Sequence, residues 1–285
     1  MKWAFLLSLI STPTLGSIFD KDDRVDTHHT DSFTQELARS VPAMIQNHRI
    51  KQVSETQFRL SGIPLSELNF CSDEAFAQET LIANCSASLI AANKVLTAAH
   101  CLDLQGYECS TYSVVFDYLN TSGPTHLMHR DQIYQCKKIL YFEFDKSLNG
   151  LDLAVIELDR PVLDRTPIKL GQSISVGEKL SMIGYPLGIS QKVVTSGSVL
   201  NDSPLTSSFH TDLDSFSVNS GGPIFNDVGE QVGVLVRGTG LNYQQYQGES
   251  CVRWHRSSSK DEFSAANDLR SLPTSLLNDT ESYSR

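Results

Sequence analysis

A series of short segments rich in Val, Ile, Leu, Ser and Tyr constrains the fold of this chain more than any other feature. Gly, Pro, Asn and Asp separate these segments, and no long helical repeat lies between them. This pattern predicts an all-β sandwich or barrel, and periodicity alone does not choose between the two. The predicted strands are Ala87–Leu96, Tyr112–Tyr118, Gln132–Tyr141, Leu153–Leu158, Lys179–Ile183, Lys192–Leu200 and Gln231–Val236.

Residues 17–70 are polar and weakly patterned by comparison. Ser32 and Gln35 have the spacing of a capping box, apolar residues recur every four positions from Phe33 to Val41, and Pro42 follows. These signals predict one short helix that ends before the proline.

The first residues predict export. Lys2 is followed by the apolar run Trp3–Ile10, and Thr14 and Gly16 supply small residues at the −3 and −1 positions of a cleavage site near Gly16. The run is far shorter than the roughly 20 residues that span a bilayer, and no later segment reaches that length. We therefore expect a protein that is secreted or periplasmic and is not inserted in a membrane.

Composition limits the partners. Of the 285 residues, 40% are hydrophobic and 20% are charged, which is enough to bury a sizeable core. The formal net charge of −10 argues against a nucleic-acid partner, because phosphate binding needs a basic face. In an exported chain the six cysteines predict three disulfides. No pair has the C-x-x-C spacing of a zinc site, so we expect no metal.

Three segments supply the groups that serine hydrolysis needs: a hydroxyl that attacks, an imidazole that takes its proton, and a carboxylate that orients the imidazole. His100 ends the run LTAAH, and Asp152 stands at the mouth of the apolar strand DLAVIEL. Ser220 lies in VNSGGP, which by composition also suits a polar turn. Asp145 and Asp103 are weaker candidates for the carboxylate, because neither begins a buried strand.

Together, in the order His, Asp, Ser, these segments resemble the chymotrypsin (trypsin-like) superfamily of serine endopeptidases. The resemblance covers roughly Cys85 to Gly238. It implies two six-stranded antiparallel β-barrels packed together, with a catalytic cleft between them. His100 and Asp152 would come from the first barrel and Ser220 from the second. The implied substrates are proteins or peptides, and no cofactor is needed.

Two departures from the trypsin pattern point to a branch of the family. Asn219 stands where trypsin-type zymogens carry the aspartate that binds a new N-terminal amine, and no Ile-Val-Gly-Gly activation sequence is present. With the Asp22–Val25 stretch, the Asn-Ser-Gly pattern is more similar to bacterial proteases of the glutamyl-endopeptidase (V8-like) branch.

The resemblance also implies an oxyanion hole made by the backbone N–H groups of Ser220 and Val218. The family normally has glycine at the earlier position, and a β-branched residue avoids backbone regions that are open to glycine. Losing one donor lowers the rate on the order of 10²- to 10³-fold. The sequence therefore leaves two readings open, a weak enzyme or a Val218 N–H that turns into place only with substrate.

The family also suggests which residues bind substrate. Asp214, followed by Ser215, lies at the base of the specificity pocket in enzymes that cut after Lys or Arg, although it could instead cap a turn or pair internally. Arg237 takes the place of a family tryptophan and could neutralise Asp214. Gly238 fits the glycine that hydrogen-bonds the substrate backbone. V8-like enzymes use a histidine where Leu235 stands, which disfavours cleavage after Glu.

In the family, the cysteine after the catalytic histidine pairs with one about sixteen residues upstream, which implies the Cys85–Cys101 disulfide. Cys109 and Cys136 flank a hairpin-like segment and could pair, which would leave Cys71 for Cys251. Six cysteines allow fifteen connectivities, so the sequence alone does not decide these last two bridges.

We thus predict a monomeric secreted serine endopeptidase that prefers Lys or Arg before the cleaved bond. The alternative is a secreted binding or scaffold protein on an impaired protease fold, for which Val218 and Arg237 are the motive. The C-terminal tail is expected to be mobile or a thin surface wrap. The predicted parts are a signal peptide (1–16), an N-terminal segment for which a propeptide is left open (17–70), a trypsin-like peptidase domain (71–254) and a polar C-terminal tail (255–285).

Overall fold

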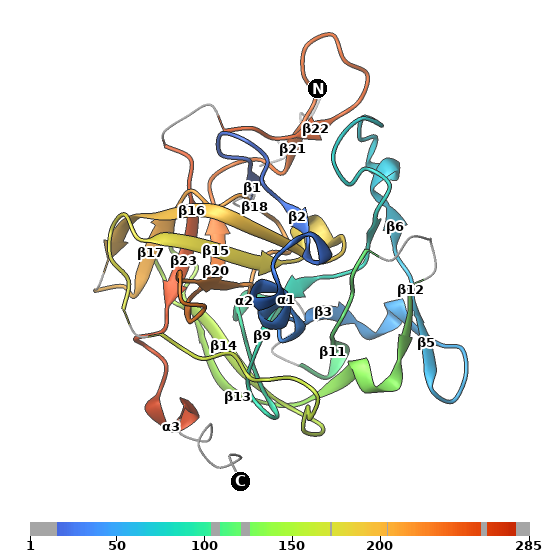
Figure 1. Cartoon of the computed structure of the whole chain (residues 1–285), viewed down its shortest axis with the longest axis vertical. Coiled ribbons are helices and arrows are strands. Elements are labelled where there is room, and N and C mark those ends of the chain that lie inside the picture. The colour runs from blue at the N-terminus through green and yellow to red at the C-terminus, as the bar shows by residue number, and fades with distance from the viewer. Residues whose placement is uncertain are drawn as a thin grey trace, which may run out of the picture.

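The computed structural model describes residues 16–103, 109–120, 126–171, 173–203, 205–257 and 261–277. The predicted signal peptide therefore lies outside the described residues, apart from Gly16. Two strongly curved sheets pack against each other (Figure 1). Among the described residues, no helix combines the length and the apolar character that crossing a bilayer requires.

The first sheet closes into a barrel. Its first and last strands, β8 and β9, are consecutive pieces of one stretch of chain, so that stretch pairs with β3 on one side and β10 on the other. All neighbouring strands are antiparallel. In sheet order the strands are β8 (Cys85–Ser86), β3 (Ala43–Gln46), β11 (Tyr112–Val115), β13 (Ile133–Phe144), β14 (Asp152–Leu158), β10 (Lys94–Thr97) and β9 (Ser88–Ala91).

The second sheet forms a closed ring of six strands, because β15 pairs with both β19 and β16. β2 (Val25–Asp26) adds a short strand beside β16. The ring order is β15 (Lys179–Gly184), β19 (Pro223–Phe225), β20 (Gln231–Gly238), β23 (Ser264–Asp268), β17 (Ser208–Thr211) and β16 (Lys192–Ser203). The predicted pair of packed six-stranded barrels is confirmed.

Each barrel has its own apolar core. Val95, Val114 and Ile156 are fully buried in the first, and Phe209 and Leu235 in the second. Burying such a side chain contributes about 1.5 to 3 kcal/mol. This explains why the Val-, Ile- and Leu-rich segments of the sequence became strands.

Smaller elements surround the barrels. The predicted helix is present as α1 (Ser32–Arg39), and the Asp31 carboxylate caps it by accepting from the N–H groups of Phe33 and Thr34. The other helices are α2 (His100–Asp103) and α3 (Thr274–Leu277), with 3-10 turns at Thr27–His29, Asn47–Arg49, Leu65–Leu68, Cys109–Thr111, Arg130–Gln132 and Pro186–Gly188. The short strands are β1 (Gly16–Ser17), β4 (Ile50–Gln52), β5 (Gln57–Leu60), β6 (Ile63–Pro64), β7 (Thr80–Leu81), β12 (His126–His129), β18 (Ser215–Phe216), β21 (Tyr243–Gln244) and β22 (Arg253–Trp254).

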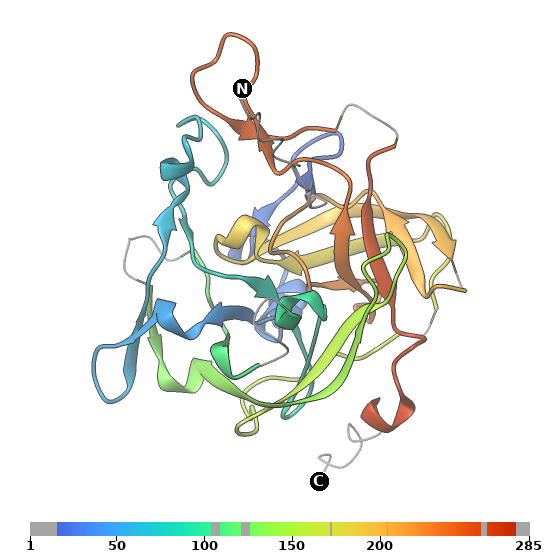
Figure 2. The ribbon, with the colours of Figure 1, turned by 180° about the vertical axis from the view of Figure 1, so that it is seen from behind.

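A third apolar cluster lies outside both barrels. It joins Ile18 of the N-terminal segment and Phe70 of the insertion between β3 and β8 to Phe216 of β18 and Trp254 of β22. The Arg24 guanidinium lies 4.4 Å from the Phe216 ring centroid and 4.2 Å from the Trp254 ring centroid. The part of the insertion that follows β6 lies at the same end of the molecule as the β21–β22 hairpin in both views (Figures 1 and 2).

Three disulfides hold these parts. They are Cys85–Cys101, Cys109–Cys136 and Cys71–Cys251, so the bridge implied by the resemblance and the two that remained open are all present. Cys71–Cys251 joins residues 180 apart in sequence and fastens the insertion to the loop before β22.

The predicted domain boundaries are too narrow at both ends. β2 and β3, within residues 17–70, are strands of the second and first sheets. The prediction of a mobile or surface-wrapped C-terminal tail is wrong for Ser264–Asp268, because this segment is buried as β23 between β20 and β17. The segment consists of small and polar residues, so its sequence does not predict a buried strand. It is buried because β20 and β17 pair with it on both sides.

Candidate active site

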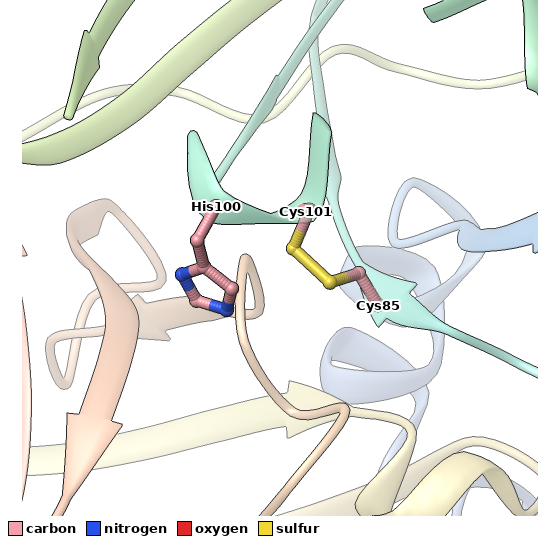
Figure 3. A group of neighbouring side chains, drawn as sticks. All are labelled: Cys85, His100 and Cys101. Carbon is pink, nitrogen blue, oxygen red and sulfur yellow. A yellow bond between two sulfur atoms is a disulfide. The ribbon is translucent and has the colours of Figure 1, made fainter. Parts of the chain in front are cut away.

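His100 begins α2, directly after β10 ends at Thr97. The Cys85–Cys101 disulfide fastens this turn to β8, and the imidazole projects beside the two sulfur atoms (Figure 3). A ring nitrogen and both sulfurs lie within 4.8 Å of one another, but the sulfurs are bonded to each other and are not thiolate ligands. The His100 side chain is 28% exposed, so the ring is held in place and still reachable.

Asp152 is the carboxylate that orients this ring. Its Oδ2 lies 2.7 Å from His100 Nδ1, and its Oδ1 accepts from the His100 backbone N–H at 2.8 Å. Asn267 Oδ1 accepts from the Asp152 N–H, which fixes the start of β14. The rival Asp145 instead accepts from the Ser147 N–H with its carboxylate. The side chain of Asp103 lies outside the described residues.

Arg237 does not neutralise Asp214, as the sequence suggested it could. Its guanidinium is buried and donates from Nη2 to Asp152 Oδ2 at 3.1 Å. β20 shifts register between Leu235 and Arg237, and a bulge of this kind changes the face on which a side chain emerges. Arg237 therefore belongs to the surroundings of the His100–Asp152 pair.

Ser220 lies on the loop between β18 and β19. Its carbonyl accepts from the Ser86 N–H at 2.8 Å, which docks the loop on the first barrel. Gly221 has φ 84°, and a Cβ there would collide with the Ser86 carbonyl, so only glycine fits. The Ser220 hydroxyl is buried and has no hydrogen-bond partner among the described residues, so the structure shows no bond between it and the His100 ring.

Val218 adopts the left-handed conformation that glycine usually provides, with φ 75°. Its carbonyl accepts from Ser86 Oγ at 2.9 Å, and Ser86 Oγ in turn accepts from the Tyr185 N–H. Val218 therefore adopts the positive φ that a β-branched residue was expected to avoid. Its N–H group and that of Ser220 have no acceptor within the described residues.

Asp214 is 2% exposed and bound to the N-terminal segment. Its Oδ1 accepts from the Phe19 N–H at 2.7 Å, and its Oδ2 accepts from the Asp23 N–H at 3.4 Å. Burial, together with the negative charges of Asp23 and Asp22, raises the pKa of the Asp214 carboxyl to about 8. The internal pairing that the sequence left open is thus the arrangement in the structure.

Ser215 and Gly238 lie on opposite sides of Ser264. Ser215 Oγ is 2.6 Å from Ser264 Oγ, and Gly238 pairs with Ser264 across β20 and β23. The other neighbour of β20, β19, pairs only with Gln231–Val234. Among the described residues, no strand pairs with the remaining edge of β20 near Gly238, so an extended peptide backbone could bind there.

Sequence reasoning missed two contributors to this site. Asn267 bonds Asp152 from the segment that was expected to be a loose tail, and its amide also donates to the Gly150 carbonyl. Phe19 reaches Asp214 across 195 residues of sequence. Neither contact leaves a local pattern.

Two packed antiparallel barrels, with a His–Asp pair on the first and a serine loop from the second, define a peptidase of the chymotrypsin type. The family model described as "Trypsin-like peptidase domain" matches residues 85–234, which is more than half of the chain. The chain belongs to this family.

The fold is also that of a solved structure. The chain is similar to the protein in "Structure of Glu endopeptidase in complex with MPD", with 17% identity and a TM-score of 0.53, covering 92% of this chain and 97% of that one. It also matches "Structure of Vibrio cholerae VesB protease", with 16% identity and a TM-score of 0.47, covering 87% and 64%. No curated protein sequence matches the chain.

Proposed function

We propose that this peptidase is a secreted serine endopeptidase with His100, Asp152 and Ser220 as its catalytic triad. The observation that carries the proposal is the His100 Nδ1–Asp152 Oδ2 contact of 2.7 Å, with the Asp152 side chain only 1% exposed. A buried carboxylate on one ring nitrogen leaves the other, Nε2, as the proton acceptor. The unpartnered Ser220 hydroxyl supplies the nucleophile.

The proposed reaction is that of a chymotrypsin-type triad, in which the Ser220 hydroxyl turns to His100 Nε2. Ser220 Oγ attacks the peptide carbonyl carbon while His100 Nε2 takes the hydroxyl proton. The N–H groups of Val218 and Ser220 would hold the oxyanion that develops. His100 then gives its proton to the leaving amine as the C–N bond breaks, which leaves an acyl ester on Ser220. Water, deprotonated by His100, hydrolyses this ester and restores the hydroxyl.

Secretion is supported by the three disulfides, because such bridges persist in oxidising compartments. Each cysteine of the chain is used in one of them. The signal-peptide prediction remains part of this proposal.

The finer proposal, cleavage after Lys or Arg, rests on Asp214. A cationic side chain would have to share its carboxylate with the Phe19 N–H, and it would have to displace the proton that the raised pKa retains near neutral pH. Leu235, buried on β20, offers no positive charge for an acidic substrate side chain. A panel of chromogenic peptides that differ only in Lys, Arg, Glu or Leu before the cleaved bond tests the preference, and equal turnover of all four would remove it.

An organophosphonate probe tests the triad directly. We expect labelling at Ser220 and cleavage of casein, with both lost in Ser220→Ala. Ser217→Ala is the matched control, because Ser217 lies on the same loop and its hydroxyl accepts a side-chain amide proton from Asn242. A folded protein with no labelling and no cleavage would support the alternative, a binding or scaffold protein on this fold.

A further inference from the structure

Arg237 brings a buried positive charge to the proposed triad. One oxygen, Asp152 Oδ2, lies 2.7 Å from His100 Nδ1 and 3.1 Å from Arg237 Nη2. The Arg237 side chain is 9% exposed and that of Asp152 is 1% exposed. Water therefore screens this three-residue contact poorly, and its charges interact more strongly than they would on the surface.

The guanidinium is fixed by the turn between β13 and β14. Nη1 donates to the Gly150 carbonyl at 3.0 Å, and Nη2 also donates to the Asp145 carbonyl at 2.6 Å. Arg237 belongs to β20 of the second sheet, whereas Asp152 and this turn belong to the first. The side chain therefore crosses between the barrels and holds Asp152 from the side of the second barrel.

We propose that Arg237 is a positioning residue of the triad, and that its charge disfavours the imidazolium form of His100. This inference rests on the proposed function for its consequence in catalysis. Arg237 orients Asp152 through the bond to Oδ2, and its charge opposes the second positive charge that forms when His100 binds a proton.

The size of the effect follows from the geometry. Both cations lie against the same carboxylate oxygen, so a protonated His100 and Arg237 are roughly 5 to 6 Å apart. At an effective dielectric constant of about 20 to 40, repulsion at that distance moves a titration by about one to two pH units. Arg237 also neutralises part of the Asp152 charge that would otherwise favour the imidazolium, and this acts in the same direction.

Other charged groups lie on the elements next to the pair. Within the described residues, Arg237 is the cation bonded to Asp152. The Asp145 carboxylate caps the turn, and His210 of β17 faces Asn149 through Nε2. The remaining charged groups nearby are Lys146, against the Phe144 ring, and Asp268 of β23, paired with Arg270.

An NMR titration of the His100 imidazole in the Ser220→Ala protein tests the proposal without relying on turnover. We expect Arg237→Gln to raise the midpoint of the His100 titration by about one to two pH units, and Arg237→Lys, which keeps the charge, to leave it nearly unchanged. Arg160→Gln is the matched control for net charge, since Arg160 lies over Tyr134 on the surface. An equal midpoint in Arg237→Gln and the parent protein would overturn the proposal.

The catalytic readout is the pH profile of kcat/KM in proteins that retain Ser220. The acidic limb should move to higher pH in Arg237→Gln, with kcat reduced and KM little changed. Arg237→Met, similar in length and apolar, provides the same two readouts if the Gln variant does not fold. If the parent protein neither hydrolyses peptides nor reacts with the phosphonate, the proposed function fails, and the NMR titration still decides whether Arg237 acts on His100.

Discussion

Replacing Asp214 by Asn removes an acid that the native state keeps protonated. In the folded protein its pKa is about 8, against an ordinary value of 3.8. Between these values the native state holds a proton that the unfolded chain has released. The free energy of unfolding therefore falls as the pH rises through this window, by about 1.4 kcal/mol per pH unit.

This single group thus lowers the free energy of unfolding by about 2 to 3 kcal/mol between pH 5 and pH 7. Above pH 8 both states are ionised and the decline ends. An asparagine does not ionise, and its Oδ1 can still accept the Phe19 N–H that Asp214 accepts at 2.7 Å. Asp214→Asn should therefore be more stable than the parent protein at neutral pH, by a margin that grows from pH 5 to pH 7.

Urea unfolding in a Ser220→Ala background measures this margin without self-digestion. The fluorescence of Trp254, which is 1% exposed, reports the transition. Asp227→Asn is the control, because Asp227 is exposed on a turn. If the difference between Asp214→Asn and the parent stayed constant from pH 5 to pH 7, the buried carboxyl would not be the proton-binding group and the reasoning would be refuted.

Three further predictions concern other parts of the molecule. Asp152→Asn should lower kcat/KM for a peptide substrate by about 10³- to 10⁴-fold, as in chymotrypsin-type triads, because the imidazole loses its orienting carboxylate. The buried ammonium group of Lys192 contacts the carboxylates of Asp26 and Glu79, and Lys192→Met leaves both without their cation. This variant should lower the free energy of unfolding in urea by about 3 to 5 kcal/mol. Cys71→Ala with Cys251→Ala removes a long-range bridge and should lower it by about 3 to 5 kcal/mol.

Each of these predictions has a result that would contradict it. Unchanged hydrolysis by Asp152→Asn would remove Asp152 from the triad. A Lys192→Met protein as stable as its parent would mean that water reaches the two carboxylates. If the double cysteine variant unfolded at the parent's urea concentration, the third apolar cluster would hold the insertion without the bridge.

The two barrels and the candidate triad could be predicted because their signals are local. A run such as Leu153–Leu158 must be buried wherever it lies. His100 and Ser220 each lie in a short motif, LTAAH and VNSGGP, that can be recognised from a few consecutive residues. The Cys85–Cys101 bridge could be inferred from the same segments through the family resemblance.

Other features depend on contacts that no local pattern encodes. Whether the Arg237 side chain points to Asp214 or to Asp152 depends on the register shift in β20. One extra residue in a strand moves the next side chain to the other face of the sheet. The partner of Asp214 is a backbone N–H at Phe19, which any residue except proline could supply. Val218 adopts a positive φ because the Ser86 hydroxyl and the surrounding loop hold its carbonyl.

The position of β23 bears on how the chain is made. It is the last strand of the described chain, yet it lies inside the second barrel, between β20 and β17 (Figures 1 and 2). Until the ribosome has added Asp268, both neighbours keep open edges and Asp152 lacks the amide of Asn267. A chain that ends before Asp268 therefore cannot complete the second barrel or hold Asp152 through Asn267.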